Sequence, residues 1–219
     1  MKTKLLLVIL LMFAALLCGC KFGRGIAGSG NRKSEKRELK SFNAIESSGA
    51  YEVSITCQKP VSFEIEADDN ILPLIKTEVR DGILYITSDQ EYHTSKSPAL
   101  RISLPDLSRV ANHGAGEVSI ADTNSSDLKI ESTGAADINA AGKAKSVTIS
   151  STGAGKIDTS KLTAEKASVT VTGAANVDVY ASDQLDVTVS GVGNISYSGN
   201  PKVVNKNISG IGSVNPKSQ

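Results

Sequence analysis

The chain has 219 residues, and its 24 basic and 23 acidic side chains nearly cancel. Aromatic residues make up 4% of the chain and tryptophan is absent, whereas small and β-branched residues are abundant. This composition is typical of a β-rich, turn-rich protein, and it excludes the low-hydrophobicity, high-charge class of disordered chains.

An apolar run of thirteen residues, Leu5–Leu17, opens the chain behind Lys2 and Lys4. A run of this length is too short to span a bilayer comfortably, and with its basic start it is typical of a secretory signal. We therefore predict that residues 1–19 are a signal peptide and take no part in the fold.

The end of the apolar run resembles the bacterial lipobox. Leu17, Gly19 and Cys20 occupy the aliphatic, small and cysteine positions of that motif. By this resemblance Cys20 is the lipidation site and becomes the diacylated first residue of the mature protein, anchored in the membrane. Lys21 follows it, which by the sorting rule for such lipoproteins favours the outer membrane. An ordinary cleaved signal peptide is the alternative, and neither reading indicates whether the head faces the periplasm or the cell exterior.

Cysteine use is simple under this interpretation. Cys18 leaves with the signal and Cys20 carries lipid, so Cys57 has no partner for an intrachain disulfide. Cys57 continues the alternation begun by Val53 and Ile55. We expect it to be a small buried core residue and not a reactive thiol.

The segment that follows the lipidated cysteine is strongly basic. Residues 21–40 hold seven basic and two acidic side chains, whereas the chain after residue 40 holds 15 basic and 21 acidic ones, a net charge of −6. We expect residues 20–38 to form a flexible tether, which either lies near anionic headgroups or is merely a solvated linker. The acidic head argues against nucleic acid as a partner.

Residues 39–105 are predicted to form an N-terminal β region of the head with loose repetition. Strict alternation of apolar and polar residues indicates strands at 61–65, 83–87 and 100–104. Pro73 argues against a central strand between the first two, and residues 90–98 are expected to form an exposed loop.

A regular repeat fills residues 106–215. Glycines recur there at steps of 20, 19, 20, 18 and 19 residues, each opening a near-copy of one phrase, and the same phrase occurs once earlier, as GAYEVSI. A period near 19 residues is the mark of a solenoid, in which each repeat packs only on its neighbours. The glycines assigned to the corners are Gly49, Gly114, Gly134, Gly153, Gly173, Gly191 and Gly210.

Apolar residues hold the same offsets in every copy. Stacked strands place same-offset side chains in rows about 4.8 Å apart, so these residues are expected to line the inside of a tube. The positions four after each glycine are Val118, Ile138, Ile157, Val177, Ile195 and Val214. We predict an all-β fold, a right-handed parallel β-helix with rungs of 18–20 residues. Each corner glycine is expected to be required because the corner needs a positive φ.

Several of these features together resemble the head GIN domain family. The resemblance rests on the lipoprotein start, on residues 42–55, on residues 69–75, on Asp81-Gly82, and on the late phrases GVGN and GIGS; it covers about residues 38–215. The family is one of auto-transporter adhesins, common among Gram-negative envelope lipoproteins. It implies a β-helical fold and an adhesive or binding role, and it supplies no catalytic residues.

Outward polar residues after the glycines form the candidate binding face. Its predicted members are Asp137, Asn139, Asp158, Asn176 and Asp178. Asp158 and Asp178 are expected on adjacent rungs, where they could form a cation site or a carboxylate pair. The alternative is a solvated face whose side chains only stabilise the stack.

No catalytic residue, metal site or cofactor is predicted, because neither His93 nor His113 belongs to a metal-spaced or nucleophile motif. We predict a non-enzymatic, adhesin-like lipoprotein whose ligand is a glycan or a protein surface. One alternative is a polysaccharide-active β-helix enzyme. The other is a structural envelope module, or one that forms homo-oligomers through its end rungs.

Overall fold

Strands dominate residues 25–217, which are the part of the chain that the computed structural model describes. The only helix among them is a single 3₁₀ turn, and it is neither long nor apolar enough to cross a membrane. The elements are β1 (Ile26–Ala27), β2 (Arg32–Lys36), β3 (Ala44–Ser47), β4 (Ala50–Thr56), β5 (Ser62–Asp68), η1 (Leu72–Leu74), β6 (Ile75–Arg80), β7 (Ile83–Ser88), β8 (Tyr92–His93), β9 (Ala99–Ser103), β10 (Arg109–Asn112), β11 (Ala115–Ser132), β12 (Ala135–Ser151), β13 (Ala154–Val171), β14 (Ala174–Tyr180), β15 (Gln184–Val189), β16 (Val192–Ser198), β17 (Val203–Ile208) and β18 (Ile211–Pro216).

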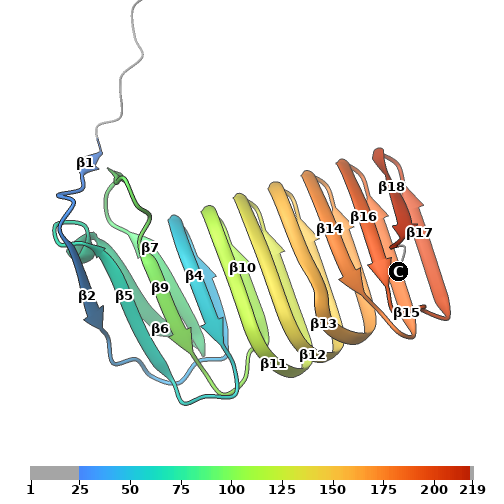
Figure 1. Ribbon diagram of the computed structural model, residues 1–219, viewed down its shortest axis with the longest axis horizontal. Coiled ribbons are helices and arrows are strands. Elements are labelled where there is room, and N and C mark those ends of the chain that lie inside the picture. Colours follow the sequence, from blue (N-terminus) through green and yellow to red (C-terminus); the bar gives the residue numbers. More distant parts are fainter. Residues whose placement is uncertain (1–24, 218–219) are drawn as a thin grey trace, which may run out of the picture.

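Successive repeats lie one on another as the rungs of a parallel β-solenoid (Figure 1). Strands β11, β12 and β13 each continue through a bend, so that one strand supplies both arms of a rung. Copies pair at equal offsets from their glycines: Val118 lies beside Ile138, and Ile138 beside Ile157. The predicted parallel β-solenoid is therefore confirmed.

The core fills the space between the two arms of each rung. Every residue four positions after a corner glycine in the regular repeats is at most 5% exposed, as the apolar alternation predicts. The arm that precedes each glycine contributes the facing rows, which are also buried; examples are Ile130, Ile149, Val169 and Val187. Because each row repeats aliphatic side chains at one offset, burial in one rung is reproduced in the next.

The corner glycines are required for a different reason from the one predicted. Of the seven, only Gly49 has a positive φ, at +155°. A side chain at Gly134 would instead overlap the carbonyl oxygen of Gly114, and one at Gly153 would overlap that of Gly134. The glycines form a column in which each Cα lies against the backbone of the preceding corner. The prediction that these corners need a positive φ is wrong for six of them, because close approach of backbones sets the requirement.

The first part of the head departs from the regular pattern. Strand β2 pairs antiparallel with β5, β5 pairs antiparallel with β9, and β6 pairs antiparallel with β7. Strand β4 joins this region to the repeats, since it pairs in parallel with both β9 and β11.

The expected flexible tether over residues 20–38 is wrong for its second half. Residues 32–36 form β2 in the ladder with β5, and the Arg37 guanidinium donates to the carbonyl of Ile75 at 2.7 Å. The described chain from residue 25 onward is therefore part of the head. The lipidation site Cys20 lies outside the described residues.

Cys57 is buried, as predicted, and is 1% exposed. Its Sγ lies 4.0 Å from the Thr123 hydroxyl on the next rung. Burial raises the pKa of this thiol, which keeps it protonated and unreactive.

Candidate functional site

The predicted polar residues do lie on one face of the solenoid. We call it the post-glycine face, meaning the outward side chains three and five residues after each corner glycine of the regular repeats. Its members are Glu117, Ser119, Asp137, Asn139, Lys156, Asp158, Asn176, Asp178, Asn194, Ser196, Ser213 and Asn215. The strands beneath are held in register over all these rungs, so the spacing of the side chains is set by the backbone ladder.

Hydrogen bonds connect this face from rung to rung. The Asn139 amide donates to a Glu117 carboxylate oxygen at 3.2 Å, and the backbone N–H of Lys156 donates to Asp137 Oδ1 at 2.9 Å. Farther along, the Asn194 N–H donates to Asn176 Oδ1 at 3.2 Å. These bonds run along the solenoid axis, so they fix side chains that would otherwise be free at the surface.

Lys156 occupies the centre of the face. Its Nζ lies 3.2 Å from Asp158 Oδ2 and 3.2 Å from Asp178 Oδ2, and Lys217 approaches Asp178 Oδ1 to 3.7 Å. The two carboxylates are register partners on adjacent rungs, as predicted. Hydrogen bonds to Asp178 and Asp158 raise the pKa of Lys156. An ammonium group therefore lies where the sequence suggested a bound cation.

Asp158 is held as an anion. Partial burial opposes ionisation, but hydrogen bonds from the Ser160 hydroxyl and N–H, together with the Lys156 ammonium, leave the pKa of Asp158 below its ordinary value. A catalytic proton donor needs the opposite shift. Within residues 25–217 no group of three metal-binding side chains is present. The geometry is that of a charged, hydrogen-bonding surface in which the Lys156 ammonium lies between two carboxylates.

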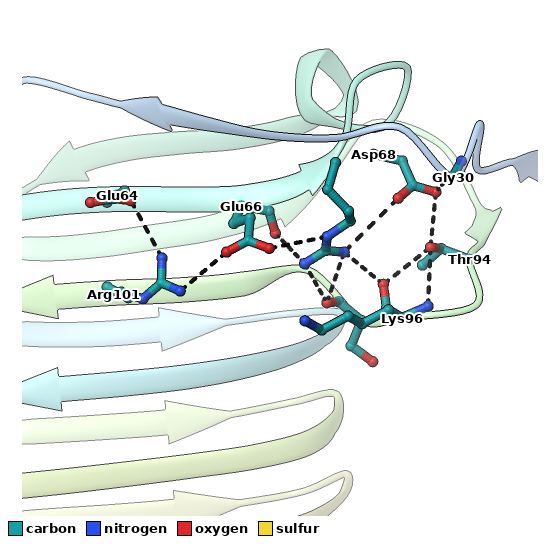
Figure 2. A network of polar contacts seen from close by, with 9 residues as sticks. Gly30, Glu64, Glu66, Asp68, Thr94, Lys96 and Arg101 are labelled. Atoms are coloured by element: carbon teal, nitrogen blue, oxygen red, sulfur yellow. Dashed lines mark hydrogen bonds and ion pairs between the residues drawn. The ribbon is translucent and has the colours of Figure 1, made fainter.

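A second polar cluster closes the N-terminal end of the head. Arg32 on β2 donates to the carbonyl of Glu66 at 2.9 Å and to that of Lys96 at 2.9 Å. Asp68 is 3% exposed, and it accepts hydrogen bonds from the Thr94 hydroxyl at 3.1 Å and the Gly30 N–H at 3.2 Å (Figure 2).

This cluster joins segments that are far apart in sequence. Arg101 on β9 reaches Glu64 at 3.3 Å and Glu66 at 3.1 Å, both on β5 (Figure 2). Hydrogen bonds from Arg101 and then Arg32 hold the pKa of Glu66 below its ordinary value. Because these groups are paired within the chain, the cluster holds β2 and the loop before β9 in place and leaves little capacity for a ligand.

A shallow trough crosses the bends between the two arms of the regular rungs, away from the post-glycine face. It has a volume of about 340 Å³, and its lining includes the buried Ala144 and Ala164 together with Lys143 and Lys145. Sequence reasoning missed this surface, although the alternation of lysines about a small buried residue was a readable signal.

The comparisons with known proteins agree with this architecture. A family model described as "Putative auto-transporter adhesin, head GIN domain" matches residues 41–201. The chain is similar to a structure described as a putative adhesin from Bacteroides fragilis NCTC 9343, with 24% identity, a TM-score of 0.74, and coverage of 88% of this chain and 100% of that one.

Two further structures share the fold. One is described as a putative adhesin from Parabacteroides merdae ATCC 43184, with 18% identity, a TM-score of 0.54, and coverage of 90% of this chain and 100% of that one. The other is described as a putative lipid binding protein from Parabacteroides distasonis ATCC 8503, with 20% identity, a TM-score of 0.57, and coverage of 89% and 100%. No protein of curated function matches the chain.

Proposed function

This chain belongs to the head GIN domain family, and we propose that it is a non-enzymatic, adhesin-like binding protein of the cell envelope. The observation that supports this most directly is the post-glycine face. It offers carboxylates, amides, hydroxyls and an ammonium at fixed spacing over six rungs. A rigid repeated surface of this kind binds through many weak polar contacts at once, because several of its side chains are already held by hydrogen bonds between rungs.

The ligand in this proposal is a glycan or a protein surface with an extended array of polar groups. Asp158 and Asp178 with Lys156 between them form the most strongly charged point of the face. Its exposed flanks include Asp137, Asn139 and Asn176, which would supply the remaining contacts. Neither a metal nor a cofactor is required.

The proposal includes a lipid anchor at Cys20 that places the protein in the outer membrane. Its support is the lipobox-like sequence and the position of the first described residues, which lie at one end of the solenoid while the C-terminal rungs lie at the other (Figure 1). Replacing Cys20 by Ala should release the protein from the membrane fraction. A mass spectrum lacking acyl chains on the wild-type cysteine would contradict the anchor.

The binding role is tested with the purified protein on glycan arrays, on intact-cell and host extracts, and on lipid vesicles. Vesicles are included because one structural neighbour is described as a lipid-binding protein. The double variant Asp158→Lys, Asp178→Lys should lose binding. The control Asp106→Lys, Asp127→Lys makes the same charge change at two exposed positions outside the post-glycine face and should retain it. Equal affinity of the two variants would discard this face as the site.

The enzymatic alternative has its own readout. Incubation with envelope and dietary polysaccharides should give neither new reducing ends nor unsaturated sugars. Product formation that disappears in the Asp158→Asn variant would replace the binding proposal by a catalytic one.

A further inference from the structure

The C-terminal rung leaves both strand edges and apolar side chains uncovered. Strand β17 pairs only with β15, and β18 only with β16, so each has one edge without a partner among the described residues. All the large hydrophobic side chains that the described chain exposes lie in this region: Val192, Val203, Ile208 and Ile211. A strand edge flanked by apolar side chains is a ready template for another chain.

One core row ends abnormally at this edge. From β10 to β15 the row contains only aliphatic residues, and at its last position β17 places a lysine. The register of the row is Val110, Ile130, Ile149, Val169, Val187, Lys206. An inward position that is aliphatic in five successive rungs is therefore charged in the sixth.

Lys206 reaches across the open end of the core. Its Nζ donates to the carbonyl of Val214 on β18 at 2.7 Å and lies 5.4 Å from the centroid of the Tyr197 ring on β16. The side chain thus joins the two arms of the final rung and covers the core end with its methylene stem, while the ammonium remains at the surface.

Among the described residues, Lys206 has no carboxylate partner. No acidic residue occurs after Asp186. The other two lysines of the final rung reach back to inner rungs, Lys202 to Asp183 at 3.0 Å and Lys217 to Asp178 at 3.7 Å. Of the three lysines of the final rung, Lys206 is therefore the one whose ammonium group lies at the end of the core and not beside a carboxylate of an inner rung.

We propose that Lys206 is an end stop, which keeps a second copy of this chain from adding its own β17 to this edge. Two copies related by a two-fold axis would pair β17 antiparallel with its counterpart, with inward side chains facing inward ones. Val204, residue 206 and Ile208 would then form a shared apolar row if residue 206 were aliphatic. With lysine there, two ammonium groups would have to be buried near each other without counterions, which is strongly unfavourable.

The test compares Lys206→Val with Lys202→Val by sedimentation velocity from about 1 to 200 µM. Both variants remove one positive charge and add one valine to the final rung, but only the first changes an inward position. We expect the wild type and Lys202→Val to remain monomeric over this range, and Lys206→Val to dimerise at concentrations at least tenfold below its upper limit. Protection of β17 amides from hydrogen exchange should rise with dimer formation.

Three results would overturn the end stop. They are a monomeric Lys206→Val protein over the whole range, equal association of Lys202→Val, and a wild type that already dimerises through β17. Lys206→Met, which keeps a long flexible stem without the charge, provides a second folded variant and should associate like Lys206→Val.

Discussion

The regular repeats and the N-terminal region hold the same solenoid together by different means. In the repeats, small corners and aliphatic rows stack in register, and each rung depends on its immediate neighbours. The N-terminal region instead combines antiparallel strands, the buried aromatic residues Phe42, Tyr51 and Phe63, and an arginine–carboxylate cluster. The stability of the repeats depends on the close approach of neighbouring backbones. The stability of the N-terminal region depends on side chains that bridge segments distant in sequence.

The two regions are therefore expected to be sensitive to different substitutions. A repeat has little room at its corner, because the neighbouring backbone is already in contact. The N-terminal region has few such contacts, but its polar cluster leaves a buried carboxylate, Asp68, dependent on partners from other segments. Substitutions in the two regions should therefore differ in size and in how far their effects spread.

The largest effect is expected at the corner column. Gly153→Ala places a Cβ against the backbone of Gly134, so one rung must move, and we expect the free energy of unfolding to fall by about 3 kcal/mol. Gly30→Ala is the control, because Gly30 has φ of +79° but no atom within 4 Å of the added Cβ. Gly30→Ala should lower the free energy of unfolding by only about 1 kcal/mol. Denaturant unfolding measures both, and equal losses would contradict the close-approach account.

A smaller and more local effect is expected at Arg32. Arg32→Ala removes the donor to the carbonyls of Glu66 and Lys96 and should lower the free energy of unfolding by about 2 kcal/mol. Hydrogen exchange should become faster in β2 and in the loop before β9, and stay unchanged in β13. Arg32→Lys keeps the charge but loses the planar fork, so it should restore only part of the protection. A uniform loss of protection over all rungs would argue against a separate role for this cluster.

Acid should weaken the N-terminal region through Glu66. Hydrogen bonds from Arg101 and Arg32 lower the pKa of this carboxyl in the folded state, so its stabilising contribution is complete above the ordinary value of 4.5. That contribution is lost as the pH falls through the lowered folded value. Hydrogen exchange of β5 between pH 5 and 3 should show the loss, and Glu66→Gln should make it smaller. If hydrogen exchange of β5 in Glu66→Gln had the same pH dependence as in the wild type, protonation of Glu66 would not explain the effect of acid.

The smallest effect is expected at Lys156. Its ion pairs with Asp158 and Asp178 lie at the surface, so Lys156→Gln should change the free energy of unfolding less than any of the substitutions above, and still less at high salt. Thermal unfolding at low and high ionic strength measures this. A loss as large as that of Arg32→Ala would mean that the polar face is a structural element of the repeats and not a surface free to bind.

The sequence predicts the structure of the repeats because each rung of a solenoid packs only on its neighbours, with residues at equal offsets side by side. Equal offsets from the glycines predicted both the buried row through Ile138 and Ile157 and the juxtaposition of Asp158 with Asp178. The rule does not describe side-chain conformations, so it could not reveal that Lys156 lies between the two carboxylates.

Other features could not be derived from local pattern. Residues 32–36 are mostly charged and show no apolar alternation. Their strand forms in the antiparallel ladder with β5, and Arg32 donates to carbonyls 34 and 64 residues away. The corner glycines were identified correctly, but their cause lies in the backbone of the neighbouring rung. A single repeat considered alone contains no information about that contact.

The junction between β4 and β11 has a consequence for the order of folding. Corner Gly114 contacts Gly49, 65 residues earlier, whereas the later corners contact partners 18–20 residues away. Closing the longer loop costs about 1 kcal/mol more in chain entropy. We therefore expect the pairing of β4 with β11 to form after the pairings between the regular rungs, so that the N-terminal region docks on repeats that have already assembled.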